Sequence, residues 1–176
     1  MNREILFKAK RIDNGEWVEG YYCKLDETTY CISEDYERHP VPTHHYILYE
    51  TMTDWGLPNR FLQFEIDPDT LCQYTGLTDK NGRKIWENDI LKFNDEIWDS
   101  CYTSCGTEYD SWEEENYGLV GYCDYSARYD FTKYKHNESQ VEADLHENHA
   151  IEFSEFVKEH EAIGNIFDNA ELLEAE

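Results

Sequence analysis

Basic residues are scarce in this sequence of 176 residues, which contains 15 Lys and Arg against 39 Asp and Glu and has a formal net charge of −24. Nucleic-acid phosphates and anionic membrane surfaces repel such a chain, because proteins bind both through Lys and Arg. We therefore expect neither nucleic acid nor a membrane as a direct partner. Basic protein surfaces, including those built to hold DNA or RNA, would attract it. A plainer interpretation stays open, in which the charge only prevents aggregation.

Long apolar runs are absent as well. No segment approaches the roughly 20 apolar residues that a membrane-spanning helix needs, and the N-terminus lacks the apolar core of a signal peptide. We therefore expect a soluble intracellular protein, in which the six cysteines are reduced thiols.

The sequence also lacks common signatures of catalysis, since it has no Gly-x-Ser-x-Gly elbow and no glycine-rich phosphate loop. Three residues separate Cys101 from Cys105, whereas a zinc knuckle usually has two, and no second cysteine pair matches. Buried free thiols are therefore favoured over a zinc site. The sequence assigns no catalytic residue, no metal ligand and no cofactor, and it favours a binding protein over an enzyme.

The histidines offer a second metal hypothesis. His44 and His45 are adjacent in an extended segment and point to opposite faces, so they are not expected to share one ion. His146 and His149 could share a helix face near two carboxylates and hold a divalent metal for phosphodiester cleavage. In a chain this rich in acid, a solvated helix face is the simpler interpretation of the same spacing.

Short strand-like segments separated by turn residues dominate the rest of the sequence. The pair Asn14-Gly15 predicts a hairpin turn because both residues tolerate positive φ, and Ser154 is expected to begin a short helix. Residues 33–45 are predicted as a loop, and residues 94–116 as the least regular part. The expected strands are 3–10, 17–23, 29–32, 46–49, 61–66, 71–75, 89–93, 117–123, 128–132 and 162–167. This pattern predicts a barrel-like or sandwich-like β fold.

Three blocks of residues form a more specific pattern. The first joins Arg3-Glu4-Ile5-Leu6-Phe7-Lys8-Ala9-Lys10 to Trp17-Val18-Glu19-Gly20-Tyr21. The second joins Gln73-Tyr74-Thr75-Gly76-Leu77, Asp79-Lys80-Asn81-Gly82 and Glu87-Asn88-Asp89-Ile90. The third joins Ile163-Gly164-Asn165-Ile166-Phe167-Asp168-Asn169 to Glu171-Leu172-Leu173. In order and spacing, these blocks resemble the YopX family of phage and prophage proteins over nearly the whole chain.

The resemblance implies a mainly β fold (β with minor α). The expected parts are an N-terminal antiparallel β subdomain at residues 1–66 and a C-terminal SH3-like β-barrel subdomain at residues 67–176, with an insert at about 94–150. The resemblance also implies a phage or prophage origin, and hence the cytoplasm of a bacterial host. It implies no reaction, and it carries over no functional residue.

The matched positions are expected to have structural roles. Glycines and Asn-Gly pairs shape turns, while Trp17, Tyr74, Trp86 and Ile90 are predicted to fill the core. Asn88 stands where the family usually has Gly.

The acidic charge is concentrated in the second half of the chain. Residues 1–93 hold 17 acids and 11 bases, whereas residues 94–176 hold 22 acids and 4 bases. A dense acidic segment interleaved with aromatic residues begins the insert, and acids can attract a basic surface while aromatic side chains supply buried anchors. The alternative is an acidic loop whose aromatics are tucked into the core. The candidate partner-binding residues are Asp95, Glu96, Asp99, Glu108, Asp110, Trp112, Glu113, Glu114 and Glu115.

These observations predict an acidic interaction protein that binds a basic, nucleic-acid-handling host protein. The concrete version is an anti-defence inhibitor, acting on a CRISPR effector (anti-CRISPR) or on a restriction nuclease. Two alternatives stay open. One is a metal-dependent nuclease or RNA-cleavage activator, and the other is a structural or regulatory phage module that oligomerises through its β edges.

Overall fold

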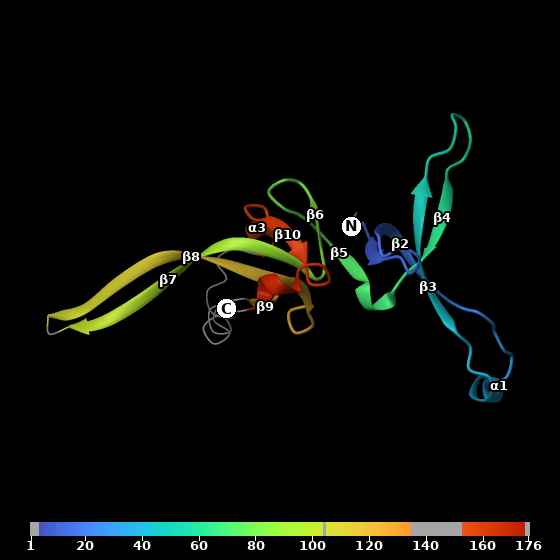
Figure 1. Cartoon of the computed structure of the whole chain (residues 1–176), viewed down its shortest axis with the longest axis horizontal. Coiled ribbons are helices and arrows are strands. Elements are labelled where there is room, and N and C mark those ends of the chain that lie inside the picture. The colour runs from blue at the N-terminus through green and yellow to red at the C-terminus, as the bar shows by residue number, and fades with distance from the viewer. Residues whose placement is uncertain (1–3, 104, 135–152, 175–176) are drawn as a thin grey trace. The chain divides into compact units, whose positions relative to one another are not determined.

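The computed structural model describes residues 4–103, 105–134 and 153–174. The chain divides into two compact units, Met1–Gly76 and Leu77–Glu176. Strands far outnumber helices in both (Figure 1), which confirms the predicted mainly β fold. The strand β5 (Cys72–Thr78) runs across the division between the units, so the boundary expected at residues 66 and 67 stays a prediction.

The first unit is an antiparallel meander. Its strands are β1 (Phe7–Lys10), β2 (Trp17–Asp26), β3 (Thr43–Thr51) and β4 (Arg60–Glu65). The predicted hairpin turn between β1 and β2 is confirmed, and Gly15 has a φ of 72° there. The chain thus reverses direction between residues 10 and 17 at Gly15, because glycine tolerates a left-handed backbone conformation.

Two expectations for the segment after β2 are wrong. Residues 29–32 form no strand, and the helix α1 (Ser33–Arg38) and the start of β3 lie inside the predicted loop at residues 33–45. Ile32, counted as a strand residue from its side chain, is exposed and precedes the helix. An apolar β-branched residue favours a strand only where a neighbouring strand buries it.

A bridge between distant residues closes the first unit. Arg11 pairs with Ile66, and the N–H of Ile12 donates to the carbonyl of Glu65 at 3.1 Å. The residue that follows β1 therefore meets the residue that follows β4. The side chains enclosed by this arrangement form a small core of Ala9, Val18, Ile47 and Ile66.

The sheet of the first unit continues through β5 to β6 (Lys84–Trp86), in the order β4-β3-β2-β1-β5-β6. A 3₁₀ turn, η1 (Pro68–Thr70), precedes β5. The carboxylate of Asp67 caps this turn by accepting from the N–H of Asp69 at 3.1 Å. An Asp before a Pro is suited to this role, because its carboxylate accepts a hydrogen bond from a backbone N–H group that has no backbone acceptor at the start of the turn.

The second unit is built on a four-stranded antiparallel sheet in the order β10-β7-β8-β9. Its strands are β7 (Asp89–Thr103), β8 (Gly106–Cys123), β9 (Arg128–Tyr134) and β10 (Glu161–Asn165), and its helical turns are α3 (Phe153–Phe156) and η2 (Ala170–Leu173). A core of Ile85, Leu91, Val120, Tyr129, Phe153, Val157 and Ala162 lies against this sheet. The SH3-like barrel expected for this part of the chain stays a prediction.

The prediction that residues 94–116 are the least regular part is wrong. Residues 94–103 and 106–116 belong to β7 and β8, which pair without interruption from Ile90–Leu119 to Thr103–Gly106. Acidic residues disfavour strands in isolation, but a continuous ladder to a neighbouring strand outweighs that preference. The remainder of the insert includes residues 135–152, which lie outside the described residues.

Within the described ranges, no helix has both the length and the apolar character that crossing a membrane requires.

Candidate functional site

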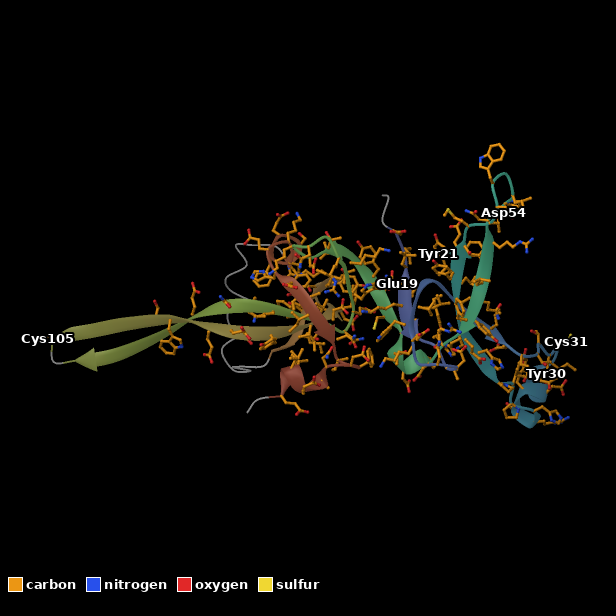
Figure 2. All side chains as sticks on the ribbon, turned by 45° about the horizontal axis from the view of Figure 1, so that its top comes forward. Glu19, Tyr21, Tyr30, Cys31, Asp54 and Cys105 are labelled. Carbon is orange, nitrogen blue, oxygen red and sulfur yellow. The ribbon has the colours of Figure 1, made fainter. Side chains whose placement is uncertain are left out.

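The candidate site is the outer part of the β7–β8 hairpin, residues 94–103 and 106–115, which we call the acidic ribbon. Strand β10 pairs with β7 only at residues 89–92, and β9 pairs with β8 only at residues 118–123. Within the described part of the chain, the acidic ribbon therefore pairs only with itself. Figure 1 shows it as a two-stranded ribbon, and Cys105 lies at its closing turn in Figure 2.

The register of the acidic ribbon places acidic residues directly opposite one another. Asp95 pairs with Glu114, Glu96 with Glu113 and Asp99 with Asp110. Like charges at directly opposed positions destabilise a hairpin. No Lys, Arg or His occurs between Lys92 and Arg128 to compensate them.

The structure brings together all nine residues that the sequence nominated for partner binding. Three lie on β7 and six on β8, in one hairpin: Asp95, Glu96, Asp99, Glu108, Asp110, Trp112, Glu113, Glu114 and Glu115. The sequence reasoning found these residues through their charge, although it missed the strands that align them. The signal for the strands was the recurrence of Ile97, Trp98, Tyr102 and Tyr109 among the acids.

Trp112 is an aromatic residue of the acidic ribbon, and 47% of its surface is accessible. Glu113, Glu114 and Glu115 beside it are exposed too. The alternative in which the aromatics are tucked into the core therefore fails for Trp112. A large apolar ring among carboxylates is suited to act as an anchor in a protein interface.

Glu115, at the inner end of the acidic ribbon, has partners within the chain. Its carboxylate accepts hydrogen bonds from the Lys92 ammonium and from the Tyr117 hydroxyl. The hydrogen bond to Glu115 raises the pKa of Lys92 and also raises the pKa of Tyr117. Lys92 therefore compensates the charge of Glu115 at the inner end of the ribbon.

An aromatic cluster supports the ribbon where it enters the four-stranded sheet. The ring of Phe93 stacks on Phe131 with centroids 5.3 Å apart and meets Phe156 edge-on at 5.4 Å. Gly118 lies against the same cluster, and a Cβ at this position would come within 2.5 Å of the Phe131 ring. The inner end of the ribbon is therefore firmly packed.

The residues of the recognisable motifs serve the fold. Asp79, which is 4% exposed, accepts hydrogen bonds from the backbone N–H groups of Asn81, Arg83 and Ala162. The Arg83 guanidinium donates to the Ala162 carbonyl at 2.9 Å. The turn of the second motif is thus connected to the residue that precedes the third motif, and the Asp79 carboxylate serves the fold.

Asn88 makes a further connection within the second unit. Its N–H donates to the carbonyl of Val120, and its carbonyl accepts from the N–H of Ile166. It has a φ of 65°, the left-handed conformation that only Gly, Asn and Asp adopt readily. This conformation explains why Asn can stand where Gly is usual.

The predicted core positions are largely confirmed. Tyr74, Trp86 and Ile90 are buried. Trp17 is only half-buried, and the ammonium groups of Lys8 and Lys10 lie over its ring at 5.0 and 5.5 Å. Trp17 is therefore a platform for two cations, not a core residue.

No group of three or more potential metal ligands occurs in residues 4–103, 105–134 and 153–174, as far as their side chains are described. His44 bonds to Glu65 and His45 to Tyr22, so the two histidines engage different partners. His146 and His149 lie outside the described residues, and the metal hypothesis for them stays untested.

The cysteines are free thiols wherever their side chains are described: Cys23, Cys31, Cys72, Cys105 and Cys123. Cys72 is buried as expected, but Cys31 and Cys105 are exposed. Hydrogen bonds from the side chain and backbone of Ser126 lower the pKa of the Cys123 thiol.

These observations define a class: an antiparallel β protein of two units in which residues of the motifs have structural roles and one long hairpin carries a dense run of acidic residues. The family model described as YopX protein matches residues 6–174. The chain therefore belongs to the YopX family.

Two further comparisons were made. The chain is similar to a protein of known structure described as "Crystal structure of protein EF1440 from Enterococcus faecalis", with 17% sequence identity and a TM-score of 0.44. The match covers 97% of this chain and 99% of that chain. A comparison with curated proteins found no match.

Proposed function

We propose that this protein is a phage-encoded interaction protein that uses the acidic ribbon to occupy the nucleic-acid-binding groove of a basic host protein. Its biological role is anti-defence, with a CRISPR effector or a restriction nuclease as the host protein. The supporting observation is the register that sets Asp95, Glu96 and Asp99 opposite Glu114, Glu113 and Asp110. Repulsion within the ribbon costs stability, and a basic partner would relieve it.

The charge spacing of the acidic ribbon supports imitation of a single nucleic-acid strand. Its eight acids occupy the positions from the pair Asn94–Glu115 to the pair Cys101–Glu108, a distance of about 24 Å at ~3.4 Å per residue. This amounts to about one carboxylate per 3 Å, and a single strand of nucleic acid carries one phosphate per ~3.4 Å. A duplex, with one charge per ~1.7 Å, is about twice as dense.

Trp112 supports the same kind of partner. Grooves that bind single strands combine basic residues with aromatic platforms on which bases stack. The carboxylates of the acidic ribbon would pair with the basic residues of such a groove, and the exposed indole between them would stack on an aromatic platform. Trp112 would contribute contact that salt does not screen, whereas the carboxylates would contribute attraction that salt weakens.

The test measures displacement of fluorescent single-stranded nucleic acid from purified CRISPR effectors and restriction nucleases, at about 50 mM and 500 mM salt. Wild type is expected to displace the probe at low salt and to lose most of its affinity at high salt. The variant Glu113→Gln/Glu114→Gln/Glu115→Gln is expected to bind at least about tenfold more weakly, which corresponds to about 1.4 kcal/mol. Trp112→Ala is expected to weaken binding at both salt concentrations.

The matched control is Glu34→Gln/Glu37→Gln/Glu159→Gln. These three exposed acids lie outside the acidic ribbon, and the change alters the net charge by the same amount. Equal losses in the two triple variants would mean that only net charge matters, and the ribbon would lose its role. Absence of displacement by wild type at low salt, for every candidate, would refute the proposed function.

A further inference from the structure

The first unit carries an apolar surface that the acidic ribbon does not explain. It consists of the β3–β4 hairpin with one residue of β2, and its exposed side chains are Tyr21, Tyr49, Met52, Trp55, Leu57, Phe61 and Leu62. Met52 is 87% exposed and Trp55 is fully exposed. Figure 2 shows Asp54, the neighbour of Trp55, at the outer end of this hairpin. We call these seven side chains the apolar hairpin surface.

The same hairpin has an open backbone edge. Strand β4 is the last strand in the order of its sheet. The N–H of Ile66 donates to the carbonyl of His45, so the even-numbered residues of β4 face β3, and Phe61 and Gln63 present their backbone groups outward. Ile12 covers this edge at Glu65, and no described strand pairs with it at residues 60–63.

The charge of this segment suits a second copy of the chain. Residues 51–63 contain one acid, Asp54, and one base, Arg60, so they are neutral within a protein of net charge −24. Two such proteins repel each other wherever their acidic surfaces meet. They meet little repulsion here, and a strongly basic partner gains no attraction from this segment.

The register divides these side chains between the two faces of the sheet. Tyr21 and Phe61 lie on one face, with ring centroids 6.1 Å apart, and the paired residues Tyr49 and Leu62 lie on the other. Phe61 and Leu62 are on the edge strand itself, so a strand added at this edge would meet one exposed apolar side chain on each face.

Two-fold symmetry allows few registers for β4 against its own copy. A two-fold axis perpendicular to the sheet keeps each side chain on its face, so it must pass between two copies of one residue, Phe61, Leu62 or Gln63. Centring on Phe61 would pair Gln63 with Asn59, which lies outside β4. Centring on Gln63 would require Glu65 to pair with the other copy, and Ile12 already bonds to Glu65. Centring on Leu62 uses only the open groups of Phe61 and Gln63.

We propose that two copies of the chain pair antiparallel through β4, with Leu62 opposite Leu62 and the Phe61 side chains on the other face of the joined sheet. The pairing extends the sheet across the two copies through the outward N–H and C=O groups of Phe61 and Gln63. It uses no residue of the acidic ribbon, so this inference stands independently of the proposed function.

The test is the molecular mass of the full-length protein in solution, measured by sedimentation and light scattering from about 1 to 200 μM. Wild type is expected to reach twice its mass of 21.0 kDa. Added salt is expected to strengthen the dimer by screening the general repulsion, opposite to its effect on ribbon binding. Leu62→Lys and Gln63→Pro are each expected to weaken self-association at least tenfold, because one sets two cations together and the other removes an outward N–H.

The matched control is Tyr125→Lys. Tyr125 is 93% exposed in the second unit, and its replacement is expected to leave the dimer unchanged. Circular dichroism and the melting temperature at a fixed low concentration confirm that each variant folds. A monomeric wild type at 200 μM, or a dimer that both β4 variants form as well as wild type does, would overturn the proposal.

Discussion

The buried carboxylate of Asp79 accepts a hydrogen bond from the backbone N–H of Ala162 at 3.3 Å, across 83 residues of sequence. The other oxygen of the same carboxylate accepts from the N–H groups of Asn81 and Arg83 at 2.8 and 2.9 Å. One side chain thus fixes a tight turn and attaches that turn to the start of β10. This bond links the turn of the second motif to the residue that precedes the third motif.

Asp79→Ala is expected to lower the free energy of unfolding by about 3 kcal/mol, because it leaves buried N–H groups without an acceptor. Asp79→Asn keeps one oxygen for the turn and should cost less. Urea unfolding followed by tryptophan fluorescence measures both. As a control, Asp124→Ala at an exposed position should change stability by less than about 0.5 kcal/mol. Equal effects of Asp79→Ala and Asp124→Ala would contradict this role.

Substitutions at Asn88 separate its backbone conformation from its side chain. With φ at 65°, Asn88→Gly should be nearly neutral or slightly stabilising, whereas Asn88→Val should cost about 1–2 kcal/mol because a β-branched residue is strained there. Thermal unfolding of the two variants provides the comparison. If Asn88→Gly proved the more damaging of the two, the side chain and not the left-handed backbone would be decisive.

The pair His44–Glu65 gives the first unit a pH dependence. The hydrogen bond to Glu65 raises the pKa of His44 above its usual 6.5, so the folded state binds the proton more tightly than the unfolded chain does. The resulting stabilisation is fully present below about pH 6.5 and is lost as the pH rises through the higher folded value.

Melting temperatures of wild type and His44→Gln between pH 5 and 9 measure this contribution. The two curves should differ most at the acidic end and converge as the pH rises. NMR titration of the His44 ring should give a midpoint above 6.5. A midpoint below that value would reverse the sign and reject the assignment.

Repulsion within the acidic ribbon predicts opposite effects of one substitution on stability and on binding. Glu113→Lys places a cation opposite Glu96 in the register, and it should stabilise the hairpin by about 0.2–1 kcal/mol. The same change should weaken binding to a basic partner. Hydrogen exchange of the ribbon amides measures the first effect, and the displacement assay measures the second. A variant that binds better, or that exchanges faster, would exclude this explanation.

The sequence predicted the fold class and three of the four core positions that it named, because turn residues and motif spacing are local signals. Asn14-Gly15 marked the first hairpin, and Tyr74, Trp86 and Ile90 were assigned to the core from their place in the motifs. Trp17 was misassigned because two lysines, not the core, cover its ring. Neighbouring side chains on other strands are not visible in a local pattern.

The nine candidate residues were found by charge, whereas their alignment was not. A register such as Glu96 opposite Glu113 depends on the pairing of β7 with β8, and the acids themselves disfavour strands. The apolar hairpin surface was missed for a related reason. Phe61 and Leu62 were assigned to a strand, and only the sheet order shows that this strand lies at an edge.

Because no other strand of the described residues pairs with the acidic ribbon, one residue can be added to or removed from each of its strands together without changing the register of β10 or β9. Such paired insertions and deletions would shorten or lengthen the charged arm in steps of about 3.4 Å. Related proteins could in this way diverge to match new binding grooves while the sheet that carries the arm stays the same.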